Sequence, residues 1–197
     1  MAILFPSSPM PLAPRPKLVD FGGDLTPFLG GPVQRIGRLG SRFGLAVELP
    51  RLNQEEARVW VSRLLQAKAS SGVHRWPQLG NGVGDEGAPK VNGAGQSGAV
   101  LSIDGLPSGK TLKEGWFFSL IAGGRRYLHL IAADATASPL GAVTVSIQPM
   151  LRIVPPDNAV IELAEPKIEG AVQGNEHAWD PDLAEEVGLS FTLVERE

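Results

Sequence analysis

The clearest pattern in the chain is an alternation of apolar and polar or small residues over 42–49. A period of two is typical of an antiparallel strand that buries one face. The residues on the apolar face are Phe43, Leu45, Val47 and Leu49. The less regular segment 33–39 precedes this strand, and Gly40-Ser41 can form a tight turn between the two. The pattern therefore predicts a β-hairpin with one apolar face.

The segment after Pro50 carries a helical pattern and its start signal. Asn53 can cap a helix, and Glu56 occupies the capping-box position three residues later. Apolar residues then recur at spacings of three and four, which gives a helix one apolar stripe. These residues are Ala57, Trp60, Val61, Leu64 and Leu65. We predict a helix over 53–68 that packs across the strand pair.

Prolines dominate the start of the chain. Five of them fall between residues 6 and 16, and they favour extended or polyproline II backbone over helix. We predict that residues 1–31 form an extended N-terminal arm. Ile3, Leu4 and Phe5 can then dock on a neighbouring subunit, the alternative being a loose terminus.

The second half of the chain favours a separate β module. A glycine-rich connection over 77–99 leads to five short strand candidates between residues 100 and 154, which predict a small β-barrel. Gly123-Gly124 is a candidate hairpin turn within this run.

Apolar strand patterns return near the C-terminus, where residues 189–194 alternate. We expect this last strand to close the first sheet. The predicted domains are therefore 32–76 together with 158–197, a β-sandwich with the helix, and 77–157, the inserted barrel. The expected fold class is mainly β.

Composition narrows the classes of function. The 197 residues carry a formal net charge of −3, which offers no overall basic surface for phosphate groups. Arg35, Arg38 and Arg42 form a local basic cluster, either on solvated strand edges or at subunit contacts. The absence of cysteine excludes disulfides, thiolate metal sites and cysteine nucleophiles. No apolar run is long enough to cross a membrane.

No segment carries a recognisable catalytic motif. Residues 105–111 resemble a phosphate-binding loop, but three residues separate the two glycines where the motif requires four. We predict a surface turn there. The histidines, His74, His129 and His177, are isolated from one another, and no serine lies in a Gly-x-Ser-x-Gly elbow. We therefore predict no catalytic, cofactor-binding or metal-binding residues, and no enzyme.

The order of turn and strand patterns along most of the chain, from about Arg35 to Glu195, resembles a known family. The matching stretches are 38–43, 49–50, the helix 53–68, 91–98, 103–106, 112–117, 126–129, 149–152 and 188–191. In the order and the kind of these segments, the chain is similar to the distal tail (Dit-like) proteins at the tail tip of long-tailed bacteriophages.

The resemblance implies a tail-tube-like antiparallel β-sandwich with one flanking helix and an inserted barrel. It implies a virion protein, made in the bacterial host cytoplasm, that forms a homo-oligomeric ring, expected to be a hexamer. Such a ring joins the tail tube protein to the hub and surrounds the channel for the tape-measure protein and DNA, which passes without specific binding. Arg35, Arg38 and Arg42, with the arm residues Ile3, Leu4 and Phe5, are the candidate subunit contacts.

A second interpretation comes from a different class of protein. Exposed tryptophans near strand ends or in loops can bind sugars, so Trp76, Trp116 or Trp179 would suit a monomeric carbohydrate-binding β-sandwich. Burial beneath loops is the simpler expectation for these side chains. Trp60 lies on the helix stripe and is predicted to be core. Oligomeric state separates the two interpretations.

Overall fold

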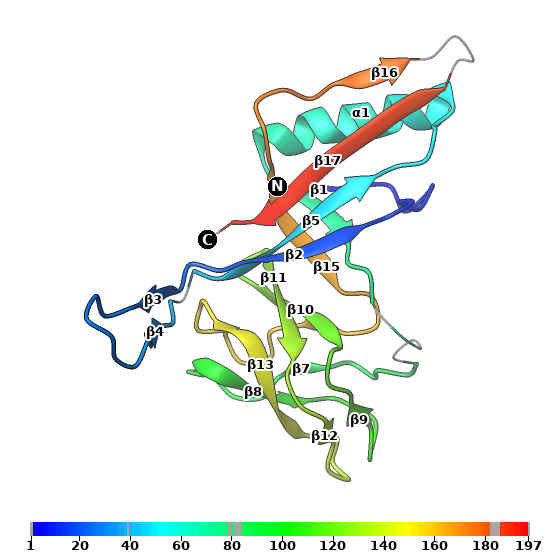
Figure 1. Cartoon of the computed structure of the whole chain (residues 1–197). Coiled ribbons are helices and arrows are strands. Elements are labelled where there is room, and N and C mark those ends of the chain that lie inside the picture. The colour runs from blue at the N-terminus through cyan, green and yellow to red at the C-terminus, as the bar shows by residue number, and fades with distance from the viewer. Residues whose placement is uncertain (1, 39, 79, 81–83, 182–185, 197) are drawn as a thin grey trace.

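The computed structural model describes residues 2–38, 40–78, 80, 84–181 and 186–196. In this part of the chain the fold is mainly β, with one helix and a nearly closed, barrel-like sheet. Figure 1 shows the helix and a seven-stranded sheet in the upper half of the molecule and a six-stranded sheet in the lower half. The predicted class, mainly β with one helix and a small barrel, is confirmed.

The seven-stranded sheet draws its strands from both ends of the chain. Its order is β1 (Ile3–Leu4), β6 (Gly72–Arg75), β15 (Lys167–Val172), β17 (Val187–Glu195), β5 (Arg42–Glu48) and β2 (Arg15–Val19), with β16 (Trp179–Pro181) paired to β17. β1 and β6 are parallel, and the other neighbours are antiparallel. The C-terminal strand pairs with β5, with Phe191 opposite Val47, so it lies in the first sheet as expected.

Helix α1 (Gln54–Ala69) covers one face of this sheet and begins where the sequence predicts. The Asn53 side chain accepts a hydrogen bond of 2.9 Å from the Glu56 amide, and the Glu56 side chain accepts one of 3.3 Å from the Asn53 amide. This is the predicted capping box. Trp60 and Leu64 are buried against the sheet, whereas Leu65 faces solvent.

The core beneath the helix contains a cluster of aromatic rings, and Phe5, from the start of the chain, is one of them. Phe5 stacks on Phe191 with ring centroids 4.9 Å apart and on Trp60 at 5.8 Å. The Phe5 amide donates to the Val73 carbonyl at 2.9 Å. Gly72 makes room for the ring, because a Cβ there would lie 2.4 Å from it. The expectation that Phe5 docks on a neighbour is therefore wrong, since its own core buries it.

The predicted hairpin between 33–39 and 42–49 does not form. Both edges of β5 are occupied, by β2 on one side and β17 on the other. The earlier segment instead contributes a short strand, β4 (Gln34–Ile36), which pairs with β3 (Gly23–Leu25). The sequence pattern missed β2 because its proline suggested a free arm, whereas an edge strand tolerates proline. Leu39, at the end of the predicted strand, lies outside the described residues.

The six-stranded sheet forms the barrel-like region. Its order is β14 (Ile161–Glu162), β10 (Phe117–Ala122), β11 (Arg125–Ile131), β13 (Val143–Leu151), β8 (Gly98–Asp104) and β7 (Lys90–Val91), with β9 (Thr111–Leu112) and β12 (Ala135–Thr136) as a separate pair. Gly123 and Gly124, at φ of 59° and 74°, form the predicted turn between β10 and β11. The two predicted strands at 143–147 and 150–154 are one strand, β13.

The ends of this sheet approach each other at β7 and β14. The Val91 amide donates to the Ala159 carbonyl at 2.9 Å, and the Ile161 amide donates to the Pro89 carbonyl at 3.1 Å. Residues 158–163 were expected in the first sheet, but β14 pairs with β10 and so completes the barrel-like sheet. The reason is that a two-residue strand carries too little pattern to select its partner.

A buried ion pair joins the two regions. One Glu195 oxygen accepts from Arg152 at 2.7 Å and from the Leu128 amide at 2.8 Å, and the other accepts from the Phe43 amide at 2.8 Å. Burial raises the pKa of Glu195, while Arg152 and the two amides oppose that change. Strands β5, β11 and β17 and the residue that follows β13 thus meet at one carboxylate.

Candidate assembly surface

A β-hairpin leaves the seven-stranded sheet between β2 and β5 and projects from the body at the left of Figure 1. We call residues 20–41 the projecting hairpin. Asp20 holds its base, because its carboxylate accepts from the Ser41 hydroxyl at 2.6 Å and from the Gly22 amide at 2.9 Å. The Ser41 hydrogen bond is the main cause that lowers the pKa of Asp20. Polar contacts therefore connect the first and last residues of the hairpin.

The three arginines of the predicted basic cluster lie in or beside this hairpin. Arg35 on β4 forms ion pairs with Asp20 and, at 3.1 Å, with Asp24. The Arg42 guanidinium lies 4.6 Å from the centre of the Phe21 ring. Arg38 is exposed. Two of the arginines thus stabilise the hairpin within the chain, and the assignment of all three to subunit contacts stays a prediction.

The tip of the hairpin exposes large apolar side chains. Phe28 is fully exposed and Leu29 is 93% exposed. The Gly30 amide donates to the Pro27 carbonyl at 3.3 Å, which closes a turn beneath these two side chains. Further apolar side chains exposed along the hairpin are Phe21, Leu25, Val33 and Ile36. Contiguous exposed apolar groups of this kind mark interaction sites on soluble proteins.

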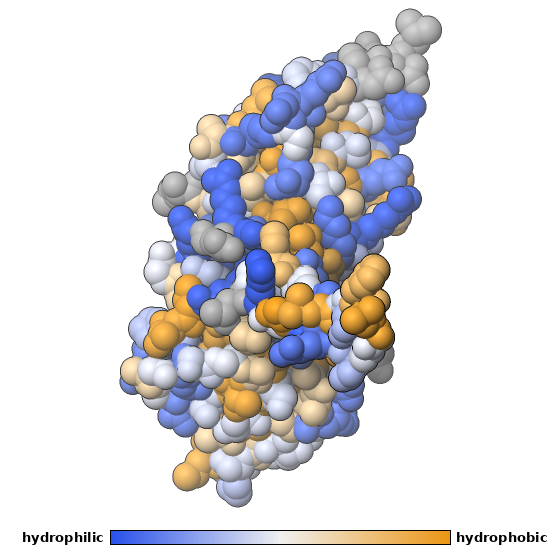
Figure 2. Space-filling view, turned by 60° about the vertical axis from the view of Figure 1, so that its left-hand side comes forward, coloured by the Kyte–Doolittle hydropathy of each residue, from blue (hydrophilic) through white to orange (hydrophobic). Residues whose placement is uncertain are grey.

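The face that carries the hairpin can be viewed directly in Figure 2, where the left-hand side of Figure 1 comes forward. Hydrophobic side chains gather across the middle of this face, with mostly hydrophilic ones above and a mixture of both kinds below. The sequence patterns do not distinguish Phe28 or Leu29 as candidate contacts. The available signal was a pair of large apolar residues enclosed by Pro27 and two glycines, outside any helix or strand period.

The predicted arm contacts have different positions. Phe5 is buried and Ile3 packs partly against the same core. Leu4 is 53% exposed, and its carbonyl accepts a 2.5 Å hydrogen bond from Arg63 on the helix. Of the three, Leu4 alone offers a substantial apolar side chain to a neighbour.

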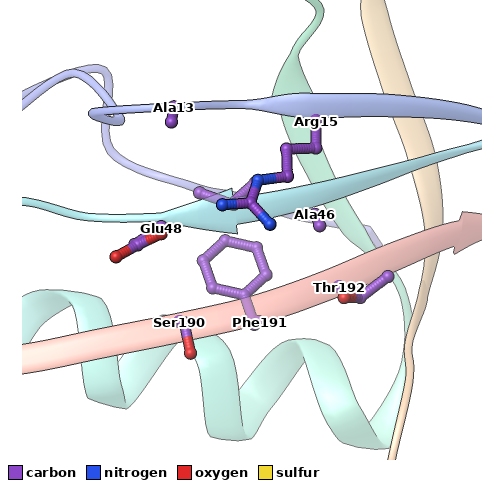
Figure 3. Close-up of a pocket in the computed structure, with 8 residues that line it drawn as sticks. Ala13, Arg15, Ala46, Glu48, Ser190, Phe191 and Thr192 are labelled. Carbon is purple, nitrogen blue, oxygen red and sulfur yellow. The ribbon is translucent and has the colours of Figure 1, made fainter.

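The outer face of the seven-stranded sheet, opposite the helix, is shallow and lined by small side chains. A hollow of about 190 Å³ lies over β2, β5 and β17. Figure 3 shows Arg15 extending across it, with the helix behind the sheet. Ala46, Ser190 and Thr192 contribute short side chains to its wall.

The candidate chemical groups stay dispersed. Among the described residues, no three His, Asp or Glu side chains are placed to hold a metal ion. His74 and His129 are buried in different regions, and burial lowers both pKa values, that of His129 to about 4. Residues 105–111 form a turn in which the Lys110 amide donates to the Pro107 carbonyl at 3.1 Å. Strand β9 follows, so no helix N-terminus is present to bind phosphate.

The tryptophans are mostly enclosed. Trp60 and Trp76 are buried in the core beneath the helix, which confirms the expectation for Trp60. Trp116 packs partly on the barrel core, with the Lys110 ammonium 5.9 Å from its ring centre. Trp179 is 44% exposed.

Comparison with known proteins assigns this chain to no family. Among the described residues, the helix is too short and too polar to span a bilayer. The chain matches no protein-family model, and no curated protein is significantly similar to it in sequence.

Proposed function

We propose that this chain is a structural protein of a bacteriophage tail tip, which assembles into a ring between the tail tube and the tail hub. The observation that supports this most is the projecting hairpin, whose two most exposed large side chains, Phe28 and Leu29, are left almost wholly uncovered by the described residues. The order of sequence segments resembles that of distal tail proteins, and this resemblance is the reason for placing such an assembly at the tail tip.

The hairpin is suited to association for two reasons. Burial of a Phe or Leu side chain contributes about 1.5–3 kcal/mol, so Phe28 and Leu29 offer a substantial part of a binding free energy. The contacts of Asp20 with Ser41 and Arg35 also order the hairpin before it meets a partner. An ordered element loses less conformational entropy on binding.

A ring requires head-to-tail contacts that close by rotation. One projecting element on one side of each subunit supports that kind of contact better than a symmetric dimer. In this proposal the ring is a hexamer, the tail tube protein and the hub bind its two ends, and the tape-measure protein and DNA pass through it. A net charge of −3 is compatible with a channel that does not hold DNA.

The alternative, a monomeric carbohydrate-binding module, rests on Trp179. Sugar platforms use exposed aromatic faces, and Trp76 is 1% exposed while Trp116 is partly enclosed. A single half-exposed ring is weaker support than the hairpin.

The test is the mass of the full chain in solution over a range of concentrations, by light scattering, followed by negative-stain imaging. We expect an oligomer, and we expect the Phe28→Ser/Leu29→Ser double variant to stay at the monomer mass of 20.9 kDa. Leu140→Ser is the matched control, because Leu140 is 92% exposed on a turn of the barrel-like region. A monomer at every concentration, with glycan-dependent quenching of tryptophan fluorescence, would favour the alternative.

A further inference from the structure

Three shallow hollows join one another on the outer face of the seven-stranded sheet, opposite the helix. The hollow of Figure 3 shares Thr192 with a larger one of about 540 Å³ over β2, β5, β15 and β17. The larger one shares Arg196 with a small one of about 50 Å³ beside the start of β11. We call this continuous surface the basic trough, because its lining contains the basic side chains of Arg15, Lys17, Arg42, Arg125, Arg126 and Arg196.

The acidic side chains of the trough do not balance these charges. Glu195 is buried and forms its ion pair with Arg152, which lies outside the lining. Glu169 is 8% exposed, and its carboxylate lies 3.8 Å from the Arg126 guanidinium. Among the described lining residues, Glu48 is the one exposed acid. The chain as a whole has a net charge of −3, so the positive surface is a local arrangement that the composition conceals.

Three of the basic side chains are open to a ligand. Arg15, Lys17 and Arg196 are exposed, and none of them forms an ion pair with another described residue. Lys17 lies over β5, since a Cβ at Gly44 would be 2.9 Å from its Cε. Arg15 extends across the sheet in Figure 3. These cations therefore lie on the outer face itself, where they can meet an anion without breaking an existing ion pair.

The lining between the cations suits a broad polar ligand. The Ala46 side chain is short, and the Ser190 and Thr192 hydroxyls are groups that donate to phosphate oxygens in nucleic-acid complexes. Phe21 is the one exposed aromatic ring among the described lining residues, and the Arg42 guanidinium lies over it. Proteins that bind single strands use open aromatic rings on which bases stack. The lining therefore favours the backbone of a duplex over unpaired bases.

We propose that the basic trough binds the phosphate backbone of double-stranded DNA without reading its sequence. A strand rise of about 3.3 Å per residue makes the trough about 20 Å long between Ser190 and Arg196. Duplex DNA carries about one negative charge per 1.7 Å of its axis, whereas an extended acidic peptide carries at most one per about 3.3 Å. The duplex thus offers more charge over the same length. This contact needs only one subunit and is independent of the proposed ring.

The test is the fluorescence anisotropy of a short labelled DNA duplex, titrated with the full chain at several NaCl concentrations. Each phosphate contact contributes about −0.9 to the slope of log K against log salt, so three contacts predict a slope of about −2.7 or steeper. The variant Arg15→Gln/Lys17→Gln/Arg196→Gln should reduce the slope by about 2.7 and weaken binding at about 50 mM NaCl at least tenfold. All three residues are exposed, so we expect the variant to fold, which circular dichroism and thermal unfolding check.

The matched control is Arg58→Gln/Lys90→Gln/Lys113→Gln, which makes the same change in net charge on the helix and on the barrel-like region. It should bind the duplex as the wild type does. Equal weakening in both triple variants, or a wild type that does not bind the duplex at low salt, overturns the proposal. Tighter binding of a single strand or of an acidic peptide of the same total charge also overturns it. The mass measurement tests the ring separately, so a chain that assembles and does not bind DNA contradicts the trough alone.

Discussion

The helix-covered sheet and the barrel-like sheet each bury an apolar core, and the two cores are built from different types of side chain. Beneath the helix, large aromatic side chains fill the space, and they come from distant parts of the chain. They are Phe5, Phe43, Trp60, Trp76 and Phe191. The barrel-like region is filled mainly by aliphatic side chains, such as Leu101, Ile103, Leu120, Val145 and Ile147, on strands that follow one another along the chain.

The two regions depend on the rest of the chain to different degrees. The strands of the barrel-like sheet lie within residues 90–162, so its contacts close over shorter sequence separations than the pairing of β5 with β17. The helix-covered sheet needs β1 from the start of the chain and β17 from its end. Contacts between distant segments form late, because closing a long loop costs entropy first. We therefore expect the barrel-like region to order before the helix-covered sheet.

The largest effect should come from the aromatic core. Trp60→Ala removes the ring that Phe5 stacks on and leaves a cavity between helix and sheet, so it should lower the free energy of unfolding by about 3–5 kcal/mol. Denaturant unfolding followed by circular dichroism measures this change. Val59→Ala is the control, because Val59 is exposed on the other side of the helix. Equal losses for both variants would mean that the helix is not packed as described.

The next effect tests whether the two regions unfold together. Glu195→Gln removes the charge that balances buried Arg152, and loss of one partner of a buried ion pair costs about 3 kcal/mol or more. Because the carboxylate connects β5 and β17 to β11 and to the end of β13, we expect the wild type to unfold in one transition and the variant in two. Calorimetry detects the separation. A variant that unfolds in one transition at the wild-type temperature would show that the ion pair does not couple the regions.

A smaller effect, confined to the barrel-like region, should depend on pH. Burial lowers the pKa of His129 to about 4, while an unfolded chain has a histidine pKa of about 6.5. The unfolded state then binds the proton more readily, so the stability is complete above pH 6.5 and is lost as the pH falls towards 4. The difference corresponds to at most roughly 3 kcal/mol.

Unfolding measured at several pH values, for the wild type and for His129→Gln, checks this expectation. The variant should lose much of the acid sensitivity, and His177→Gln, outside both cores, should keep it. His74 also has a lowered pKa and contributes to the remainder. An identical pH dependence in all three proteins would contradict the assignment to His129.

The smallest effect should be at the start of the helix. Asn53→Ala removes the side chain that accepts from the Glu56 amide and should cost about 1 kcal/mol, through the helix-covered region alone. Asn53→Asp preserves the acceptor and serves as the matched control. Hydrogen exchange of the first helical turn should increase in the alanine variant and stay near the wild-type rate in the aspartate variant.

Local patterns in the sequence were sufficient for several elements. The alternation over 42–49, the capping residues Asn53 and Glu56, and the Gly123-Gly124 turn each predicted what the structure contains. These signals involve residues within one strand, one helical turn or one hairpin. Their physical causes act over the same short range, through side-chain direction, orphan amide groups and the torsion angles open to glycine.

Only the tertiary structure decided which strands pair and which apolar side chains remain exposed. The sequence patterns predicted that β4 pairs with β5, that β14 belongs to the first sheet, and that Phe5 contacts a neighbouring subunit or stays loose. The structure differs in each case, because the partner of a strand depends on every other strand that competes for the same edge. It also gave no distinction between Phe5, buried over Gly72, and Phe28, exposed at the hairpin tip. Both are phenylalanines in proline-rich or glycine-rich surroundings. Their environments differ because burial is a property of the whole assembled core, and no short stretch of sequence contains that information.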